Sequence, residues 1–238
     1  KVVTTDPVSA LQGRVSGVTV TQSSGSPGSP ADIMIRGFGS FGNNQPLYIV
    51  DGVQGDPYFI DASNIASMEI LKDAASGAIY GTRAANGVVI ITTKKGKSGK
   101  PKIDIGSTLS MNTPRKKMEL LDSQGYVKVH RQMYENAGAA LPQYVVNPPD
   151  NNTDWIEETH RNGMLNMQNV RVSGASDNIN YSIGGNYADE TGILIGSEFQ
   201  KKGINSNIGI TKGKLKITTN LNYSETYKED YKFSLRET

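Results

Sequence analysis

Two different patterns of apolar and polar residues divide the chain near residue 100. Before that point, short apolar segments alternate with turns rich in Gly, Ser and Pro, which predicts a mixed domain of short strands and helices. Asp51-Gly52 is a two-residue turn signal, and Gly13 and Gly81 are placed to end helices. The expected strands are 18–22, 33–36, 47–50, 68–71 and 88–93, and the expected helices are 7–13 and 73–81.

After residue 102, apolar and polar residues alternate over five long segments. The clearest is 178–187, in which Ile and Tyr occupy one face and Asn and Ser the other. The others are 102–112, 166–176, 203–210 and 214–223. Segments of about ten residues exceed an ordinary soluble strand and match a tilted membrane strand. Polar faces rich in Asn, Thr and Ser suit a wet interior, while Tyr181, Tyr187 and Tyr223 are placed as in an aromatic girdle.

The connections between these segments agree with a membrane barrel. Short turns at 176–178 and 212–213 alternate with a longer link at 189–199 and a very long one at 113–165, as in outer-membrane barrels. The long connection is expected to lie outside the cell and to carry a helix over 123–136. About five strands leave a barrel incomplete, because the smallest have about eight. A soluble antiparallel sheet with one wet face would show the same alternation and stays open as an alternative.

Composition excludes several classes of protein. The chain has 238 residues, no Cys, two His and a net charge of +2. It therefore has no disulfide scaffold and no Cys-ligated zinc, and the near-neutral charge argues against a nucleic-acid-binding arm. We expect no metal, no cofactor and no nucleic-acid partner. A Lys-rich run from Lys94 to Lys102 is interpreted as a solvated linker.

Candidate catalytic motifs are weak. Residues 37–42 match G-x-G-x-x-G, but the following segment leads into another strand, whereas a dinucleotide site requires a helix there. The carboxylate pairs Glu157-Glu158 and Asp189-Glu190 are adjacent residues and lack the separation across a substrate that a glycosidase needs. We predict no catalytic residues and expect that the protein is not an enzyme.

Five ordered sequence blocks resemble TonB-dependent outer-membrane transporters of the SusC/RagA type. Residues 46–53 read P-L-Y-I-V-D-G-V and residues 78–89 read A-I-Y-G-T-R-A-A-N-G-V-V, each similar to a motif of the family's plug domain. The other blocks are L-Q-G-R-V-S-G-V at 11–18, I-M-I-R-G at 33–37 and I-A-S-M-E-I-L-K-D at 65–73. The resemblance is firm from 11 to 96 and continues loosely into Y-A-D-E-T-G at 187–192.

This resemblance implies a fold and a function. The fold class is an α+β plug domain followed by antiparallel transmembrane β-barrel strands. The expected parts are the plug at 1–96, a linker at 97–101, and the first barrel strands at 102–238 with an extracellular loop at 113–165. The protein would import oligosaccharides or peptides across the bacterial outer membrane, with the plug gating the pore. The segment that contacts TonB and the remaining barrel strands are expected to lie outside this chain.

The same resemblance implies partners, while position within the motifs suggests roles for individual residues. The partners would be a SusD-like surface lipoprotein, TonB and outer-membrane lipid, in a dimer of transporter–lipoprotein pairs. Charges within the plug motifs are predicted to pair with one another or with the barrel wall and hold the plug shut; they are Arg36, Asp51, Lys72, Asp73 and Arg83. A plug loop that could face substrate carries Phe38, Phe41, Asn43 and Asn44, and contact with the barrel wall alone is the other interpretation of that loop.

A second function from another class remains open at this point. A soluble adhesion or carbohydrate-binding protein with a β-sandwich tail would also combine a mixed head with alternating strands. The need for detergent would separate the two, because only a membrane barrel exposes its apolar strand face to lipid.

Overall fold

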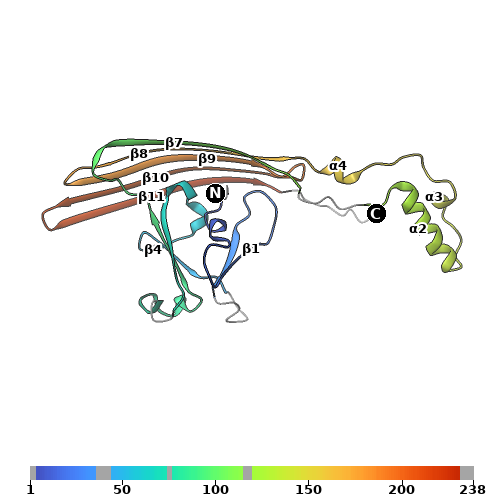
Figure 1. Ribbon diagram of the computed structural model, residues 1–238, viewed down its shortest axis with the longest axis horizontal. Helices are drawn as coiled ribbons and strands as arrows, with labels where there is room; N and C mark the ends of the chain where they lie inside the picture. The colour runs from blue at the N-terminus through green and yellow to red at the C-terminus, as the bar shows by residue number, and fades with distance from the viewer. Residues whose placement is uncertain (1–3, 36–43, 74–76, 115–119, 231–238) are drawn as a thin grey trace.

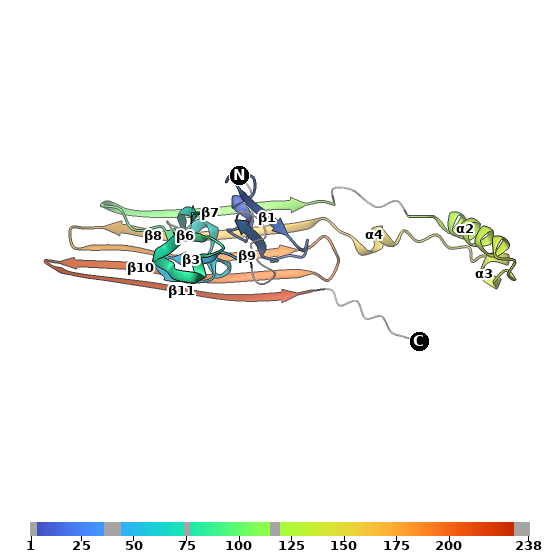
Figure 2. The ribbon, with the colours of Figure 1, turned by 90° about the horizontal axis from the view of Figure 1, so that it is seen from below.

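The computed structural model describes residues 4–35, 44–73, 77–114 and 120–230. An N-terminal domain, residues 4–98, lies against one face of a long antiparallel sheet, and a helical excursion projects beyond the end of that sheet (Figure 1). We call the sheet the strand wall. The two views at right angles agree that the domain sits below the wall, toward the middle of the strands (Figure 2).

The N-terminal domain contains two small sheets. β1 (Val18–Gln22) pairs antiparallel with β2 (Ala31–Ile35). The second sheet has the order β4-β3-β6-β5, in which only β3 and β6 run parallel. Its strands are β3 (Leu47–Val50), β4 (Val53–Gln54), β5 (Ile65–Leu71) and β6 (Val88–Thr93). Short 3-10 helices cover Ser9–Leu11, Pro57–Phe59, Ala62–Asn64 and Ala78–Ala84.

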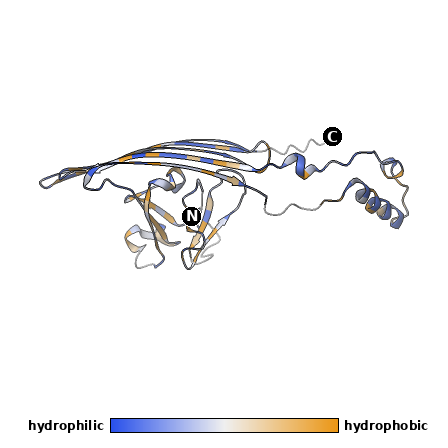
Figure 3. Cartoon of the chain, turned by 45° about the horizontal axis from the view of Figure 1, so that its top comes forward, coloured by the Kyte–Doolittle hydropathy of each residue, from blue (hydrophilic) through white to orange (hydrophobic). Residues whose placement is uncertain are grey.

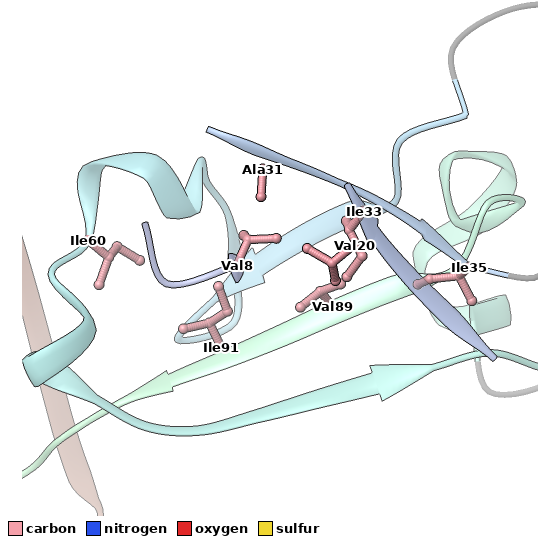
Figure 4. Packing of buried hydrophobic residues seen from close by; sticks show 8 residues of the cluster. All are labelled: Val8, Val20, Ala31, Ile33, Ile35, Ile60, Val89 and Ile91. Carbon is pink, nitrogen blue, oxygen red and sulfur yellow. The ribbon is translucent and has the colours of Figure 1, made fainter. Parts of the chain in front are cut away.

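An aliphatic core fills the space between these sheets (Figure 4). β2 contributes every second residue, because Ala31, Ile33 and Ile35 point inward while their neighbours are half-buried. β6 is one of the two interior strands of its sheet and is buried on both faces, with Val89 and Ile91 in this core and Val88 in a second cluster. Each fully buried Val or Ile contributes about 1.5–3 kcal/mol. The remaining members of the main core are Val8, Val20 and Ile60.

The turn after β3 forms as its sequence predicts. Asp51 and Gly52 have φ values of 48° and 91°, and they join Val50 to its strand partner Val53. Positive φ at both turn positions matches the right-handed twist of the flanking strands, and Asp and Gly tolerate it best. The Asp51 carboxylate also accepts hydrogen bonds from the Thr93 amide at 2.9 Å and the Thr93 hydroxyl at 2.6 Å, which ties the turn to the end of β6.

The strand wall is a five-stranded meander with the order β11-β10-β9-β8-β7. Its strands have 13 to 15 residues, longer than the ten expected, because pairing continues through Thr191 and Glu198 and shortens the link between them. β7 begins at Gly99, inside the segment expected to be a linker. The strands are β7 (Gly99–Asn112), β8 (Gly163–Ala175), β9 (Ile179–Thr191), β10 (Glu198–Lys212) and β11 (Leu215–Glu229).

The two faces of the wall differ in chemistry, as alternating colours along the strands show (Figure 3). The face away from the N-terminal domain, the outer face, carries aliphatic side chains such as Ile105, Leu109 and Leu221, which are 57–81% exposed. A soluble monomer rarely exposes so extended an apolar surface. The inner face, toward the domain, carries mainly Asn, Ser, Thr and Gly.

Four glycines of the inner face each lie directly opposite an asparagine of the neighbouring strand. A Cβ atom added at these glycines would lie 2.4–2.9 Å from the partner's side chain. Each amide therefore lies over the backbone of the adjacent strand instead of standing upright. The pairs are Gly106–Asn169, Gly184–Asn205, Gly203–Asn186 and Gly209–Asn180.

The described part of the long connection between β7 and β8 carries three helices. α2 (Ser123–Asn136) has the predicted bounds and begins where the Asp122 carboxylate accepts a hydrogen bond from the Gly125 amide at 2.7 Å. α3 (Gln143–Val146) packs against α2, and α4 (Trp155–Thr159) leads back to the wall. Within the described residues, no helix combines the length and apolar character needed to cross a membrane.

Candidate functional site

The predicted loop site falls mostly outside the described residues. Phe38, Phe41 and Asn43 lie there, as does Arg36 of the predicted charge set. Asn44 is described, three residues before β3 begins. The substrate-facing role of this loop stays a prediction.

The described members of the predicted charge set lie at separate places in the N-terminal domain. Lys72 donates to the Ser16 carbonyl, and the Arg83 guanidinium donates to the Gln54 side-chain oxygen at 2.6 Å. Asp51 binds Thr93 as described above, and Asp73 is exposed two residues after β5 ends. These contacts fasten neighbouring segments of the domain to one another. Pairing among the five charges stays a prediction.

A buried lysine of the wall reaches into the N-terminal domain instead. Lys201 on the inner face of β10 is 2% exposed. Its Nζ donates to the carbonyl of Tyr58, with the Ile60 carbonyl 3.5 Å away, and lies 5.2 Å from the centre of the Tyr58 ring. Carbonyl oxygens and an aromatic face are both favourable surroundings for an ammonium group.

The negative charges of three carboxylates of the domain favour the charged form of this lysine: Asp61, Asp6 and Asp56. Each also caps a turn of the domain. Asp56 accepts from the Tyr58 amide at 2.9 Å, Asp61 from the Ser63 amide at 2.8 Å, and Asp6 from the amides of Val8 and Ala31 at 3.0 and 2.8 Å. These hydrogen bonds hold the three carboxylates in place on the domain side of Lys201. Among the described lysines of the wall, Lys201 is the one that is buried.

Beside Lys201, an aromatic side chain of the wall occupies a space left by a glycine. Phe199 is 1% exposed, and a Cβ atom added to Gly28 would lie 2.1 Å from its ring. The Gly28 amide donates to the Glu190 carboxylate at 3.3 Å, and the Gly28 carbonyl accepts from the Tyr58 hydroxyl at 3.2 Å. Gly28 has φ of +63°, which favours glycine independently of the space available.

Polar contacts extend the junction along the inner face. The Asn64 side-chain amide donates to the Asn205 side-chain oxygen at 2.9 Å, and Lys228 of β11 lies 3.3 Å from the Ser29 hydroxyl. The contact between domain and wall is therefore mostly polar and surrounds one aromatic ring. We call these residues the junction: Lys201, Phe199, Glu190, Asn205 and Lys228 of the wall with Tyr58, Ile60, Gly28, Ser29 and Asn64 of the domain.

Burial changes the proton affinity of two groups on the domain side of the junction. It raises the pKa of Asp6 above its ordinary value, although the amides of Ala31 and Val8 and the charge of Lys201 act in the opposite direction. Burial, with nearby Asp6 and Asp56, also raises the pKa of the Tyr58 phenol. Among the residues that the structure describes, no group of three or more His, Asp or Glu side chains could hold a metal ion.

Patterning alone misses Lys201, because it predicts a link at residues 189–199 and a next strand that begins at Gly203. The signal was present in the alternation. Extending the inward positions Gly203, Asn205 and Asn207 backward by two residues at a time reaches Lys201 and Phe199. Burial of those positions depends on the N-terminal domain, whose contacting residues Ile60 and Asn64 lie 141 residues away in the chain from Lys201 and Asn205.

Comparisons with known proteins agree with this architecture. Residues 2–88 match the model of the TonB-dependent Receptor Plug Domain. TonB-dependent receptor P3 of Formosa agariphila is 39% identical over 84% of this chain and 19% of its own length. TonB-dependent receptor SusC of Bacteroides thetaiotaomicron is 33% identical over 84% of this chain and 21% of its own length. The chain thus spans about a fifth of the length of these relatives.

The solved structures include the RagAB peptide importer in its "open-open" state. That chain is 25% identical, with a TM-score of 0.85, and the match covers 98% of this chain and 30% of the importer chain. The likeness includes both the N-terminal domain and the strand wall, since it extends over nearly the whole chain. The chain therefore belongs to the SusC-like TonB-dependent receptors, with the N-terminal domain as its plug and β7–β11 as part of its barrel.

Proposed function

We propose that this chain supplies the gate of an outer-membrane importer for oligosaccharides or peptides. The observation that carries the proposal is the junction, where a small domain with its own core is held against a polar wall by a few side chains. A domain with its own core can move as a unit, and a junction of few contacts gives a defined place for release. In this proposal, force transmitted by TonB separates the plug from the wall.

The remaining parts of the proposal come from the family. A SusD-like lipoprotein would close the extracellular side, and two transporter–lipoprotein pairs would form a dimer in the outer membrane. Support for a peptide substrate comes from the RagAB importer, whose name states that it carries peptides. The polar inner face supports either substrate, because its many Asn, Ser and Thr side chains offer the amide and hydroxyl groups that can hydrogen-bond to sugars and to peptides.

A reversible crosslink across the junction tests the gating role. The chain has no native cysteine, so Asn64→Cys with Asn205→Cys places two thiols where hydrogen-bonded side chains now meet. In the native protein that contains this chain, we expect oxidation to abolish uptake of labelled casein peptides or malto-oligosaccharides, and reduction to restore it. The matched control is Asn207→Cys with Asn220→Cys, which links two wall strands through another hydrogen-bonded pair. Unchanged uptake by the fully oxidised junction variant would contradict the proposal.

Substitution of Lys201 tests the same role without a crosslink. Lys201→Met keeps the length of the side chain but removes its charge and hydrogen-bond donors. Loss of a hydrogen bond made by a charged group costs about 1.5–3 kcal/mol, so plug release should become at least about tenfold more frequent. Ion conductance of the native protein in planar bilayers measures release. Lys212→Met, at the exposed end of β10, is the control. Equal conductance in both variants would remove Lys201 from the gate.

A further inference from the structure

A groove lies on the outer face of the wall, opposite the plug. In the register of the strands, five residues form one straight row across all five strands: Ile105, Val170, Gly185, Ile204 and Tyr223. Four of them project large side chains that are 48–81% exposed. Gly185 has no side chain, so the centre of the row is a notch, and the surrounding groove has a volume of about 570 Å³.

The adjacent row, on the side of the wall that leads to α2–α4, is polar. It consists of Ser107, Gln168, Tyr187, Lys202 and Glu225. The row on the other side of the notch is mainly aliphatic and includes Ile103, Val172, Ile183 and Leu221. The notch therefore lies at the edge of the apolar band of the outer face, where polar chemistry begins.

The polar row carries one cation and one carboxylate at directly opposed positions. Lys202 of β10 is the strand partner of Glu225 of β11, and both are exposed. Tyr187 is the strand partner of Lys202 on β9, and Gln168 is the partner of Tyr187 on β8, so both add hydrogen-bond donors to the row. An anion matches the lysine and a primary ammonium group matches the carboxylate, so the row is complementary to a zwitterion whose two charges are covalently linked.

We propose that this groove binds one phosphoethanolamine lipid, with an acyl chain in the notch over Gly185 and the headgroup on the polar row. The phosphate would contact Lys202 with Tyr187 or Gln168, and the ammonium group would contact Glu225. The inference rests on the proposed placement of the wall in a membrane. It goes beyond general contact with lipid, because it assigns a chain position and a headgroup chemistry to named residues.

Filling the notch is the first test. Gly185→Leu should be compatible with the fold, because a Cβ atom there would meet only the Gly203 carbonyl at 3.7 Å, an ordinary contact. The native protein that contains this chain is purified in detergent and mixed with phosphatidylethanolamine, and bound lipid is counted by native mass spectrometry. We expect retention to fall at least tenfold in Gly185→Leu. Thr219→Leu, on the same face but outside the groove, should leave it unchanged.

The headgroup is tested with lipids that share the same acyl chains. Phosphatidylglycerol lacks the ammonium group, and phosphatidylcholine has a quaternary one without N–H donors. We expect the wild-type protein to retain phosphatidylethanolamine at least fivefold better than either. Glu225→Gln should remove this preference, and Lys202→Gln should weaken retention of phosphatidylethanolamine and phosphatidylglycerol alike. Lys212→Gln is the charge control.

Three outcomes would overturn the proposal. They are equal retention of all three lipids by the wild type, retention unaffected by Gly185→Leu, and a groove that mediates contact between copies, seen as dimer loss in Gly185→Leu without any change in bound lipid. A protein that stays monodisperse without detergent would overturn this inference and the membrane placement together. Failure of the junction crosslink to stop uptake, with lipid retention as expected, would remove only the gating role.

Discussion

The interior of the plug and its junction with the wall are built from opposite materials. The interior is aliphatic, and Val89 and Ile91 have no exposed surface. The junction relies on Lys201, Asn64 and Glu190 around a single Phe ring. Aliphatic side chains lose their stabilising contacts when they separate, and water does not replace those contacts. Polar groups can exchange a protein partner for water when they separate. The difference suggests a plug that stays folded while its attachment to the wall is broken and remade.

The largest expected effect is on the plug interior. Ile91→Ala should lower the free energy of unfolding of the plug by about 2–5 kcal/mol, because it leaves a cavity in a packed core. Hydrogen exchange of plug peptides in the native protein measures this loss. Amides of the wall should keep their exchange rates. A uniform loss of protection in both regions would show that plug and wall unfold together, which contradicts a plug that is stabilised by its own core.

A smaller effect is expected where the plug backbone meets the Phe199 ring. Gly28→Ala should weaken plug docking by about 1–3 kcal/mol, because its Cβ overlaps the ring and its positive φ disfavours a side chain. Protease sensitivity of the 23–30 segment in the native protein reports docking. Adding Phe199→Ala to Gly28→Ala should recover the share of docking that is lost through overlap with the ring. It should not recover the share that is lost because alanine disfavours the positive φ. An additive double variant would show that the two residues do not act through contact.

A single amide pair should contribute less. Asn64→Ala and Asn205→Ala should each raise the ion conductance of the native protein by about two- to tenfold, because plug release becomes more frequent. This range corresponds to the 0.5–1.5 kcal/mol of one neutral hydrogen bond. The double variant should do no more than either single variant, because both remove the same bond. Full additivity in planar-bilayer recordings would place the contribution outside this contact.

The smallest expected effect is on pH dependence. Because burial raises the pKa of Asp6, the folded plug holds that proton more tightly than the unfolded plug does. This contribution to stability is fully present below the unfolded pKa of about 3.9 and is lost as pH rises through the folded pKa. Plug protection from hydrogen exchange should therefore decline over that range in the wild type and change less in Asp6→Asn. Asp177→Asn, at an exposed turn, controls for the loss of one carboxylate. If plug protection in Asp6→Asn depended on pH as steeply as in the wild type, the assignment of this effect to the Asp6 carboxyl would be wrong.

Local chemistry made several elements predictable. The Asp51-Gly52 turn, the α2 helix and strands β1, β3 and β6 appear where turn residues and patterning placed them. Strand ends were less predictable. Thr191 of β9 and Glu198 of β10 still pair with each other, which extends both strands beyond the predicted ends. Such pairing depends on the neighbouring strand and cannot be predicted from the sequence of one strand alone. Residues 7–13 were expected to be a helix, but only Ser9–Leu11 form one turn, because the Asp6 carboxylate and Thr4 hydroxyl organise a compact bend there.

The candidate site was harder to predict than the fold. Motif membership pointed to Asp51, Lys72 and Arg83, whose described contacts lie within the plug. Lys201 belongs to no recognisable motif, and a lysine in an alternating strand is usually solvated. Only the docking of a distant domain buries it, so its importance depends on a long-range contact that patterning cannot reveal.

The glycine–asparagine pairs of the inner wall have a consequence for the width of the proposed passage. At Gly106, Gly184, Gly203 and Gly209, the amide of the opposite strand occupies the space that a side chain would need. Any substitution there must turn that amide upright into the lumen, so two side chains would protrude where none did. In the proposed importer, these four glycines would therefore help to set the clearance of the passage, and with it the largest cargo that fits.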